Sequence, residues 1–424
     1  MSETPLLRLE EALAAILAGV EPLPPETVPV GEGSGRVLAE AAHARLTLPP
    51  WPNSAMDGFA VRSADVAAAT AEAPVHLPVA GEIAAGHLPD RPLTPGTAVR
   101  ILTGAILPDG ADAVVPVEET DAPAGVAALP DRVAILAAPR PGAHIRAAGG
   151  DVQAGDLLLA AGARLSPAGI GALAAAGIAQ IPVTRRPRVA ILSTGDELVP
   201  VGTPVDGARI PDSNGVQLAA QARSAGAAVA AMGIVADEPA ILRRRLAEAI
   251  AATDVVISSG GVSVGAHDEV RLAFAALGQV DLWRVAIQPG KPLAFGRAPR
   301  PDGGTTLLFG LPGNPVSAFV TFELFVRPLL RRLGGLTADD GRDRIRAILA
   351  EPVTKSAGRR AFLRVVLEPD PGGSLPSARL AGGQGSHILS ALALADGLAI
   401  IPEETDRLAA GAVVEVLLLD RGAA

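Results

Sequence analysis

The region from residue 186 to residue 332 alternates apolar runs with amphipathic ones, and this rhythm restricts the fold more than any other feature of the chain. Runs such as RVAILSTG and DVVISSGG are typical of buried strands, whereas DSNGVQLAAQARSAG and EPAILRRRLAEAIAA have helical spacing. Asp212 and Ser213 can start the first of these helices, and Gly226 can end it. Because strands joined through helices pair in parallel, the pattern predicts an α/β domain with a parallel-rich sheet covered on both faces.

The remaining sequence predicts smaller domains around this one. Residues 49–149 and 340–424 consist of short apolar runs broken by glycine and proline, so we expect a β domain and a C-terminal β barrel. Apolar residues at helical spacing predict one helix that starts near Leu9 and a second at 165–178. In the second, Ser166 can cap the helix and Pro167 can occupy its first turn. We expect these helices to pack together in a discontinuous domain of residues 1–48 and 150–185.

Composition excludes several classes of protein. The 424 residues carry a net charge of −9 and are only 2% aromatic, which argues against nucleic-acid binding. The chain has no cysteine, which rules out disulfides, thiolate metal sites and cysteine nucleophiles. No apolar run reaches the about 18 residues of a membrane span, and acidic residues stand where a signal peptide would be basic. We therefore expect a cytoplasmic protein without membrane partners.

Four polar loops follow predicted strands of the α/β region. In open parallel sheets, ligands bind beyond the carboxyl ends of the strands. Any one of these loops alone could be only a turn between strand and helix, but four at one rim predict a binding site. The four loops are STGDEL (193–198), SSGGVSVGAHDE (258–269), QPGKP (288–292) and GLPGNPVSA (310–318).

The second loop has the composition of an oxyanion site. Gly260, Gly261 and Gly265 lack side chains, so backbone N–H groups can approach a phosphate, and a helix starting near His267 would direct its positive end there. Lys291, held between glycine and proline, supplies a cation; the alternative is an ordinary solvated lysine. Neither the dinucleotide nor the P-loop pattern occurs.

Carboxylates at the same rim suggest a divalent cation. Asp196, Glu197 and Asp268 could hold Mg²⁺, which prefers oxygen ligands and substrate phosphates. The alternative is that the aspartates are helix caps or first-turn acids. Asn314 can cap the next helix with Pro315 in its first turn, which leaves Pro312 without a structural reason.

Seven motifs in one order resemble those of a known family. They are NSAMDGFA, RILTGA, STGDEL, SSGGVSVGAHD, QPGKPLAFG, GLPGNPVSA and GSH, and they span nearly the whole chain. This order is similar to that of the molybdopterin molybdenumtransferases, which include MoeA and the E domain of gephyrin.

The resemblance implies a fold and a reaction. It implies four domains in an elongated homodimer. Residues 1–48 and 150–185 would form the dimerisation domain, residues 49–149 the β domain, residues 186–332 the molybdopterin-binding domain, and residues 340–424 the barrel. The implied reaction inserts molybdate into adenylylated molybdopterin and releases AMP, with Mg²⁺ or another divalent cation. It also implies a cleft shared with the partner subunit, and handover to the adenylyltransferase of the pathway and to molybdoenzymes.

The resemblance also implies site residues by motif. The expected catalytic residues are Asp57, Thr103, Glu197 and Asp268, and the expected metal ligands are Asp151, Glu197 and Asp268. The expected substrate-binding residues are Ser259, Gly260, Gly261, Ser263, Gly265, Lys291, Pro312, Asn314, Pro315, Asp237, Arg359 and Ser386.

Departures from the family pattern leave alternatives open. Gln288 stands where the family commonly has a lysine, so one anion contact is weaker or is supplied elsewhere, and only Arg146 remains of a basic run before GGD. The rival functions are a molybdopterin adenylyltransferase-like enzyme, a pyridine-nucleotide amide hydrolase, and a non-catalytic molybdopterin-binding scaffold. The choice of molybdate over tungstate, and the identity of the divalent cation, stay open.

Overall fold

The computed structural model describes residues 6–122, 128–260, 269–336, 342–370, 372–373 and 375–419. Gly261, Ser263, Gly265 and Asp268 lie outside the described residues, so their predicted roles are not tested. The chain forms two compact units: residues 1–27, 35–39 and 182–424 form the first, and residues 28–34 and 40–181 form the second. Within the described parts, no helix is both long and apolar enough to cross a membrane.

The first unit contains a six-stranded mixed sheet in the order β15-β12-β16-β20-β19-β17. Neighbours among the first four strands run parallel, as the sequence predicts, whereas β19 pairs antiparallel with both β20 and β17. Short connections without a helix, residues 285–291 and 300–304, join these last three strands, which permits antiparallel pairing. The strands are β12 (Arg188–Thr194), β15 (Ala228–Val235), β16 (Val255–Ser259), β17 (Gln279–Arg284), β19 (Pro292–Pro299) and β20 (Thr305–Leu311).

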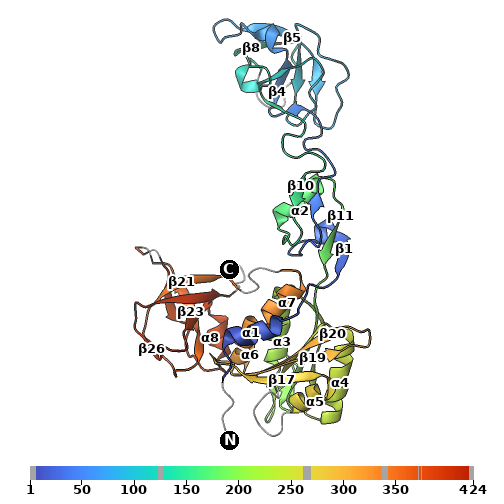
Figure 1. The fold of residues 1–424 in the computed structure, drawn as a ribbon. Coiled ribbons are helices and arrows are strands. Elements are labelled where there is room, and N and C mark those ends of the chain that lie inside the picture. Colours follow the sequence, from blue (N-terminus) through green and yellow to red (C-terminus); the bar gives the residue numbers. More distant parts are fainter. Residues whose placement is uncertain are drawn as a thin grey trace. The chain divides into compact units, whose positions relative to one another are not determined.

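Helices cover both faces of this sheet (Figure 1). One face packs against α4 (Pro239–Ala252) and α5 (Glu269–Leu277). The other packs against α1 (Leu9–Leu17), α3 (Ser213–Ser224) and a continuous helical stretch of α6 (Pro315–Thr321), the π-helix η4 (Phe322–Val326) and α7 (Arg327–Leu333). The sequence predicts α1 as a helix, but its buried face belongs to this core and not to a pair with the helix at 165–178.

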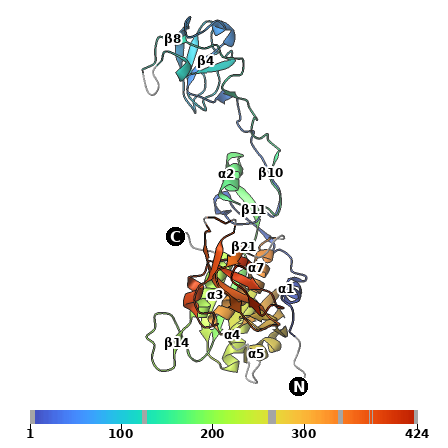
Figure 2. The ribbon, with the colours of Figure 1, turned by 90° about the vertical axis from the view of Figure 1, so that its left-hand side faces the viewer.

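A ribbon and a barrel complete the first unit. The ribbon of β13 (Leu198–Val199) and β14 (Ile210–Pro211) projects from the α/β region (Figure 2). The C-terminal strands close on themselves in the order β23-β24-β21-β27-β25, which confirms the predicted barrel, and β18 (Ile287–Gln288) pairs with β23. The barrel elements are β21 (Arg344–Leu349), β23 (Arg360–Glu368), β24 (Ser377–Leu380), β25 (Gly397–Ile401), β27 (Val413–Leu418), the pair β22 (Val353–Thr354) and β26 (Arg407–Leu408), and α8 (Leu389–Ala393).

The second unit is mainly β structure, as its composition predicts. Its main sheet has the order β7-β4-β6-β5-β8 around Phe59 and Ile135. Its helix α2 (Pro167–Ala175) begins as predicted, with Gly169 N–H donating to Ser166 Oγ at 3.1 Å. The strands are β2 (Ala42–His43), β3 (Asn53–Ser54), β4 (Gly58–Val61), β5 (Val75–Ile83), β6 (Ala98–Ile101), β7 (Ala113–Pro116), β8 (Arg132–Ile135), β9 (Ile145–Arg146) and β10 (Leu157–Leu159).

Three 3-10 turns and one ribbon remain. The turns are η1 (Val30–Glu32), η2 (Ser63–Val66) and η3 (Val117–Glu119). Strands β1 (Pro25–Pro29) and β11 (Gln180–Thr184) pair with each other where the chain passes between the units.

Candidate functional site

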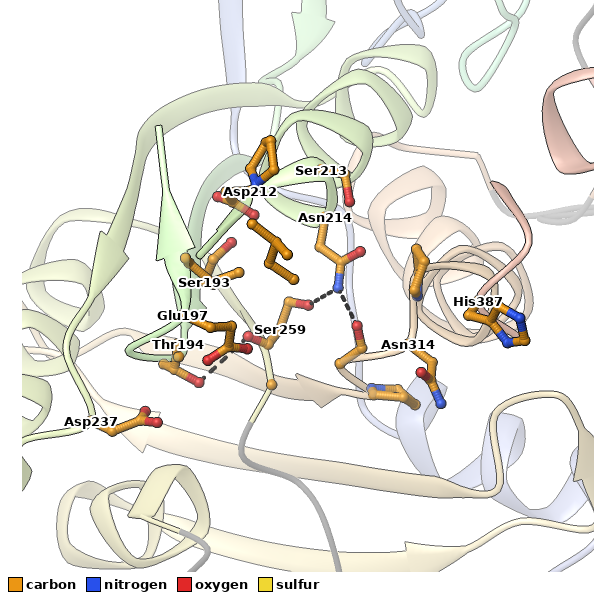
Figure 3. Close-up of a pocket in the computed structure, with 18 of the residues that line it drawn as sticks. Ser193, Thr194, Glu197, Asp212, Ser213, Asn214, Asp237, Ser259, Asn314 and His387 are labelled. Atoms are coloured by element: carbon orange, nitrogen blue, oxygen red, sulfur yellow. Dashed lines mark hydrogen bonds between the residues drawn. The ribbon is translucent and has the colours of Figure 1, made fainter. Parts of the chain in front are cut away.

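A cavity of about 860 Å³ lies at the carboxyl ends of β12, β16 and β20, and we call it the α/β cavity (Figure 3). All four predicted rim loops contribute described residues to its lining, QPGKP through Lys291 and Pro292. The expected site residues that it brings together are Glu197, Asp237, Ser259, Gly260, Lys291, Pro312, Asn314 and Pro315.

Two glycines of this cavity have steric reasons to be glycine. Gly260 has a φ of +97°, and a Cβ there would lie 2.5 Å from the carbonyl oxygen of Thr194. Gly195 has a φ of +151°, which residues with a side chain rarely adopt, and the Glu197 carboxylate folds back over this glycine. The cavity therefore keeps bare backbone at two adjacent strand ends, as oxyanion binding requires.

Asn214 connects two of the rim loops (Figure 3). Its Nδ2 donates to Ser259 Oγ at 2.8 Å and to the carbonyl oxygen of Gly313 at 2.7 Å. The neighbouring Asp212 caps α3 as predicted, because its Oδ1 accepts from Gly215 N–H at 2.8 Å. The start of α3 is thus fixed by its cap while Asn214 reaches across the cavity floor.

The carboxylates of the α/β cavity match the ligand chemistry of Mg²⁺ without forming a complete site. Glu197 and Asp237 line the cavity and are exposed, and Asp196 accepts from the backbone N–H of Asp237 at 3.3 Å. Among the described residues, no group of three or more His, Asp or Glu side chains could hold a metal ion. Mg²⁺ often takes only one or two carboxylates together with water and substrate phosphates, so the oxygen ligands here fit that cation in kind.

A second cavity of about 530 Å³ lies between the α/β region and the barrel, and we call it the barrel cavity. Its charged lining residues within the described chain are all basic: Lys291, Lys355, Arg359 and Arg364. Ser386 also lines it, so the structure brings together three residues expected from the motifs, Lys291, Arg359 and Ser386. Such a lining attracts an anion.

Arg364 is the most unusual member of this group. Its side chain is 0% exposed, and its Nη2 donates to the carbonyl oxygens of Gly383 at 2.8 Å and Gly385 at 3.1 Å. Its Nε and Nη1 have no hydrogen-bond partner among the described residues. Burial lowers the pKa of Arg364 from its usual value. A buried guanidinium with unused donors needs a partner, and an anion in the cavity would provide one.

The two cavities share Lys291, Pro292, Pro312 and Asn314. The backbone holds the lysine loop from both sides, because Val285 N–H donates to Lys291 O at 2.8 Å and β18 pairs with β23. Asn314 does not cap α6 through its side chain, which corrects the sequence prediction, while Pro315 does stand in the first turn. The Asn314 side chain lines both cavities instead.

In the second unit, Asp57 and Thr103 form a pair, although 45 residues separate them. Asp57 Oδ1 accepts from Thr103 N–H at 2.7 Å and from Thr103 Oγ1 at 2.8 Å. The backbone hydrogen bond first, and the hydroxyl second, lower the pKa of Asp57. Asp151 lies in an exposed turn of the same unit, where its backbone N–H donates to the carbonyl oxygen of Leu48 at 3.0 Å.

Sequence reasoning missed several residues that line the cavities: Asn214, Arg284, Lys355, Arg364 and His387. His387 directly follows Ser386 in the GSH motif, which was a usable signal. Arg364 had no such signal, because Arg359 and Arg360 stand close by and composition cannot tell which arginine faces inward.

Comparisons with known proteins agree with this geometry. Residues 7–177 match the family described as the MoeA N-terminal region (domain I and II), residues 190–332 match a probable molybdopterin binding domain, and residues 346–419 match the MoeA C-terminal region (domain IV). The chain is 44% identical to molybdopterin molybdenumtransferase 2 of Mycobacterium tuberculosis over 398 residues, which cover 92% of this chain and 94% of that protein. It is 34% identical to the molybdopterin molybdenumtransferase of Haemophilus influenzae over 414 residues, covering 97% of this chain and 98% of that protein.

A solved structure has the same fold over almost the entire chain. The molybdopterin biosynthesis MoeA protein of Pyrococcus horikoshii superposes with a TM-score of 0.76 at 34% identity, covering 97% of this chain and 99% of that one. With three successive family regions matched and relatives aligned over nearly their full length, the chain belongs to the MoeA family of molybdopterin molybdenumtransferases.

Proposed function

We propose that this transferase of molybdenum cofactor biosynthesis inserts molybdate into adenylylated molybdopterin and releases AMP. The observation that carries the proposal is the pair of adjoining cavities that share Lys291. The α/β cavity is the larger, and glycine backbone and carboxylates line it. The barrel cavity is smaller, and the charged residues in its described lining are all basic. This combination suits a phosphate-containing organic substrate next to a small dianion.

The α/β cavity is proposed to hold the pterin nucleotide. Its volume of about 860 Å³ lies in the range of ligand pockets, about 300–1,000 Å³. Gly260 and Ser259 would face the phosphates, and Lys291 would balance their charge from the opposite side. Gly261, Ser263 and Gly265 continue the same loop and are proposed to extend this contact. Asp237, Pro312, Asn314 and Pro315 would bound the organic part of the substrate.

The barrel cavity is proposed to hold molybdate. Lys291, Arg359, Ser386 and the unsatisfied donors of Arg364 surround it. Gln288, which replaces a lysine common in the family, lines the same cavity, so Lys355 and Arg364 are proposed to supply the anion contact that it lacks. Molybdate would then lie on the far side of Lys291 from the nucleotide.

A divalent cation is proposed to join the substrate, with Glu197 and Asp268 as its protein ligands. The role of Asp151 as a further ligand stays a prediction from the family motif. When bound, Mg²⁺ polarises a phosphoanhydride oxygen and neutralises charge on the leaving phosphate. Within the first unit, Lys291 is proposed to balance the charge of the substrate and the glycine loop to bind its phosphates. The family motif assigns Asp57 a catalytic role, and its hydrogen bonds from Thr103 favour the anionic carboxylate that such a role would use.

The reaction breaks one P–O bond of the phosphoanhydride. AMP leaves with the electron pair of that bond, and an oxygen from water or molybdate takes its place on the phosphate of molybdopterin. The sulfur atoms of molybdopterin replace oxygen ligands of molybdate, which leave as water after protonation. Molybdenum keeps its oxidation state, so the step needs no added reductant.

AMP release measures this proposal directly. Purified protein is incubated with adenylylated molybdopterin and Mg²⁺, with and without molybdate, and the product is tested for activation of a cofactor-free molybdoenzyme. Molybdate-dependent AMP release together with activation is the expected result. In the Asp268→Asn variant we expect AMP release to fall, and an unchanged rate would remove this residue from the proposed mechanism.

Other outcomes would support the rival functions. Binding of the substrate without AMP release would favour a non-catalytic scaffold, whereas formation of adenylylated molybdopterin from molybdopterin and ATP would favour an adenylyltransferase-like enzyme. The carboxylates and the basic barrel cavity favour the insertion reaction over both.

The assembly of the protein is part of the proposal. From the family resemblance we propose a homodimer that acts in the cytoplasm, receives its substrate from the adenylyltransferase and passes its product to molybdoenzymes. Light scattering coupled to gel filtration would measure the mass in solution, and a monomer at micromolar concentration would contradict the dimer.

A further inference from the structure

Helix α3 has a polar face that its core packing does not explain. Leu218, Ala219 and Ala222 are buried in the core of the α/β region. A different set of residues, spaced by three, four and three, forms a polar row along the helix, because that spacing returns to the same side of an α-helix. The polar row consists of Asn214, Gln217, Gln221 and Ser224.

Every member of the polar row hydrogen-bonds the same segment, residues 313–327. At the cavity end, Asn214 Nδ2 donates to Gly313 O at 2.7 Å, and Gln217 Nε2 donates to Pro315 O at 3.1 Å. The accepting carbonyls lie just before and at the start of α6. The row therefore holds the GLPGNP loop at the point where it enters the helix.

The far end of the polar row is anchored on a buried ionic cluster. Gln221 Nε2 donates to Glu323 Oε1 at 2.6 Å, and Arg327 Nη2 donates to Ser224 Oγ at 3.2 Å. The Glu323 side chain is 0% exposed and also accepts from the Nε atoms of Arg327 and Arg342, each at 2.5 Å. Polar groups buried in this way are costly unless they are paired, so the cluster permits one register between α3 and the segment.

Asn214 also reaches a third element, because the same Nδ2 donates to Ser259 Oγ at the end of β16 (Figure 3). A side chain at position 214 that makes both of these hydrogen bonds must carry two N–H donors on one atom. Aspartate has none and serine is too short to span both acceptors. The β16 loop and the GLPGNP loop lie side by side, because β16 and β20 pair in parallel and Gly260 N–H donates to Leu311 O at 3.2 Å. Beyond that last backbone bond, the Asn214 amide links the Ser259 side chain to Gly313, and all three residues line the α/β cavity.

We infer that Asn214 is a positioning residue for the reaction: it fixes the Ser259 side chain relative to the Gly313 backbone beyond the paired ends of β16 and β20, and so the geometry in which the phosphates of the substrate are held. The inference rests on the proposed function for the identity of the substrate. The positioning itself rests on the three-way contact of Asn214 with Ser259 and Gly313 and on the anchored row behind it.

Steady-state AMP release from adenylylated molybdopterin with Mg²⁺ and molybdate tests the inference in Asn214→Ala and Asn214→Asp. Gln217→Ala is the matched control, because it removes one amide–carbonyl hydrogen bond to the same segment from a residue outside the cavity lining. We expect kcat/KM to fall about 100-fold in both Asn214 variants, the effect of misplacing reacting groups by about 1 Å. In Gln217→Ala we expect less than about a twofold change at a similar melting temperature, since one such bond contributes little to stability.

Hydrogen–deuterium exchange gives a readout that does not depend on turnover. Asn214→Ala should speed exchange in both 256–260 and 311–316, whereas Gln217→Ala should affect only the second segment. Asn214→Ser serves as a further variant should the alanine protein not fold. Unchanged exchange at 256–260, or a kcat/KM equal to that of the control, would overturn the inference. Absence of AMP release by the wild type would instead contradict the proposed function, and the exchange measurement would still decide the positioning.

Discussion

At the scale of single residues, the arginines of β23 and the turn before it have different surroundings. Arg360 pairs with Glu10 at 2.6 Å and Glu403 at 2.9 Å. Among the described residues, the side chain of the wholly buried Arg364 bonds only the carbonyl oxygens of Gly383 and Gly385. Arg359, which the motif suggests, is half-buried in the barrel cavity. The chemistry of an anion site favours the arginine with unused donors over its neighbours.

Replacing Arg364 with methionine should therefore weaken the response to molybdate. Because a hydrogen bond to a charged group contributes about 1.5–3 kcal/mol, we expect the molybdate concentration for half-maximal AMP release to rise at least about tenfold. The protein should still fold, although the carbonyl oxygens of Gly383 and Gly385 lose their donor, which costs about 1–3 kcal/mol for an unsatisfied buried group. The matched variant is Arg359→Met, for which we expect a smaller change. A larger rise of the half-maximal molybdate concentration in Arg359→Met than in Arg364→Met would favour Arg359, the residue that the motif suggests, as the main anion ligand.

Asp57 permits a prediction about pH. Its folded-state pKa lies below the ordinary value of about 3.9, because the backbone and then the hydroxyl of Thr103 donate to it. Its contribution to stability is therefore complete above the ordinary value and is lost as the pH falls through the depressed one. In Thr103→Val the hydroxyl is gone, so the acidic limb of the pH–rate profile should move to higher pH. Thr103→Ser keeps the hydroxyl and should keep the profile; a shift in both would point to another group.

At the scale of secondary structure elements, the amino ends of the central strands are tied together by one carboxylate. Asp254, 3% exposed and directly before β16, accepts from Arg188 N–H at 2.7 Å and from Arg185 at 2.8 and 3.0 Å. Arg300 Nη1 donates to it at 2.9 Å. This cluster lies at the edge of the sheet opposite the α/β cavity, so it bears on stability and not on the chemistry of the site.

Asp254→Asn should destabilise the first unit. Burial alone would raise the pKa of Asp254, but the hydrogen bonds from Arg185 and from Arg188 N–H outweigh it, and the pKa is lowered. Breaking a buried pair costs about 3–5 kcal/mol, which denaturant unfolding would measure. The difference in unfolding free energy between the wild type and Asp254→Asn should be complete above about pH 4, the ordinary range of the aspartate pKa. It should shrink at lower pH, as Asp254 becomes protonated. Asp302→Asn is the control, because Asp302 is the exposed partner of Arg300. This variant should leave the midpoint of denaturant unfolding unchanged.

At the scale of the whole molecule, most of the second unit is one insertion, residues 40–181, and the residues of the first unit that flank it lie together. Ala39 N–H donates to Pro182 O at 3.0 Å, and Leu38 and Val183 form an isolated β-bridge. The described lining residues of both cavities belong to the first unit, whereas Asp57, Thr103 and Asp151 belong to the second.

Deleting residues 40–181 and joining the ends with a short glycine-serine linker should leave a folded protein. We expect cooperative thermal unfolding and retained binding of AMP, measured by calorimetry, because the cavities remain. We expect no molybdate-dependent AMP release, because three proposed active residues are absent. Turnover by the shortened protein would show that those residues are dispensable.

The sequence by itself determined the elements and the rim of the site. Alternating apolar and amphipathic runs are local patterns, so the helices, the C-terminal strands and the caps at Ser166 and Asp212 could be read from them. The carboxyl ends of parallel strands share one edge, so loops distant in sequence could be placed together before the fold was known. Glu197, Ser259 and Lys291 do line one cavity.

The tertiary structure alone decided which side chains face that cavity and which hold it in shape. Barrel closure selected Arg364 from three nearby arginines, and packing of α3 on the helical stretch 315–333 turned Asn214 toward two loops. It also moved α1 from its predicted partner into the core of the α/β region and left Asn314 without a capping bond. The physical reason is that burial and the pairing of buried polar groups depend on contacts between distant segments, which local spacing and composition do not encode.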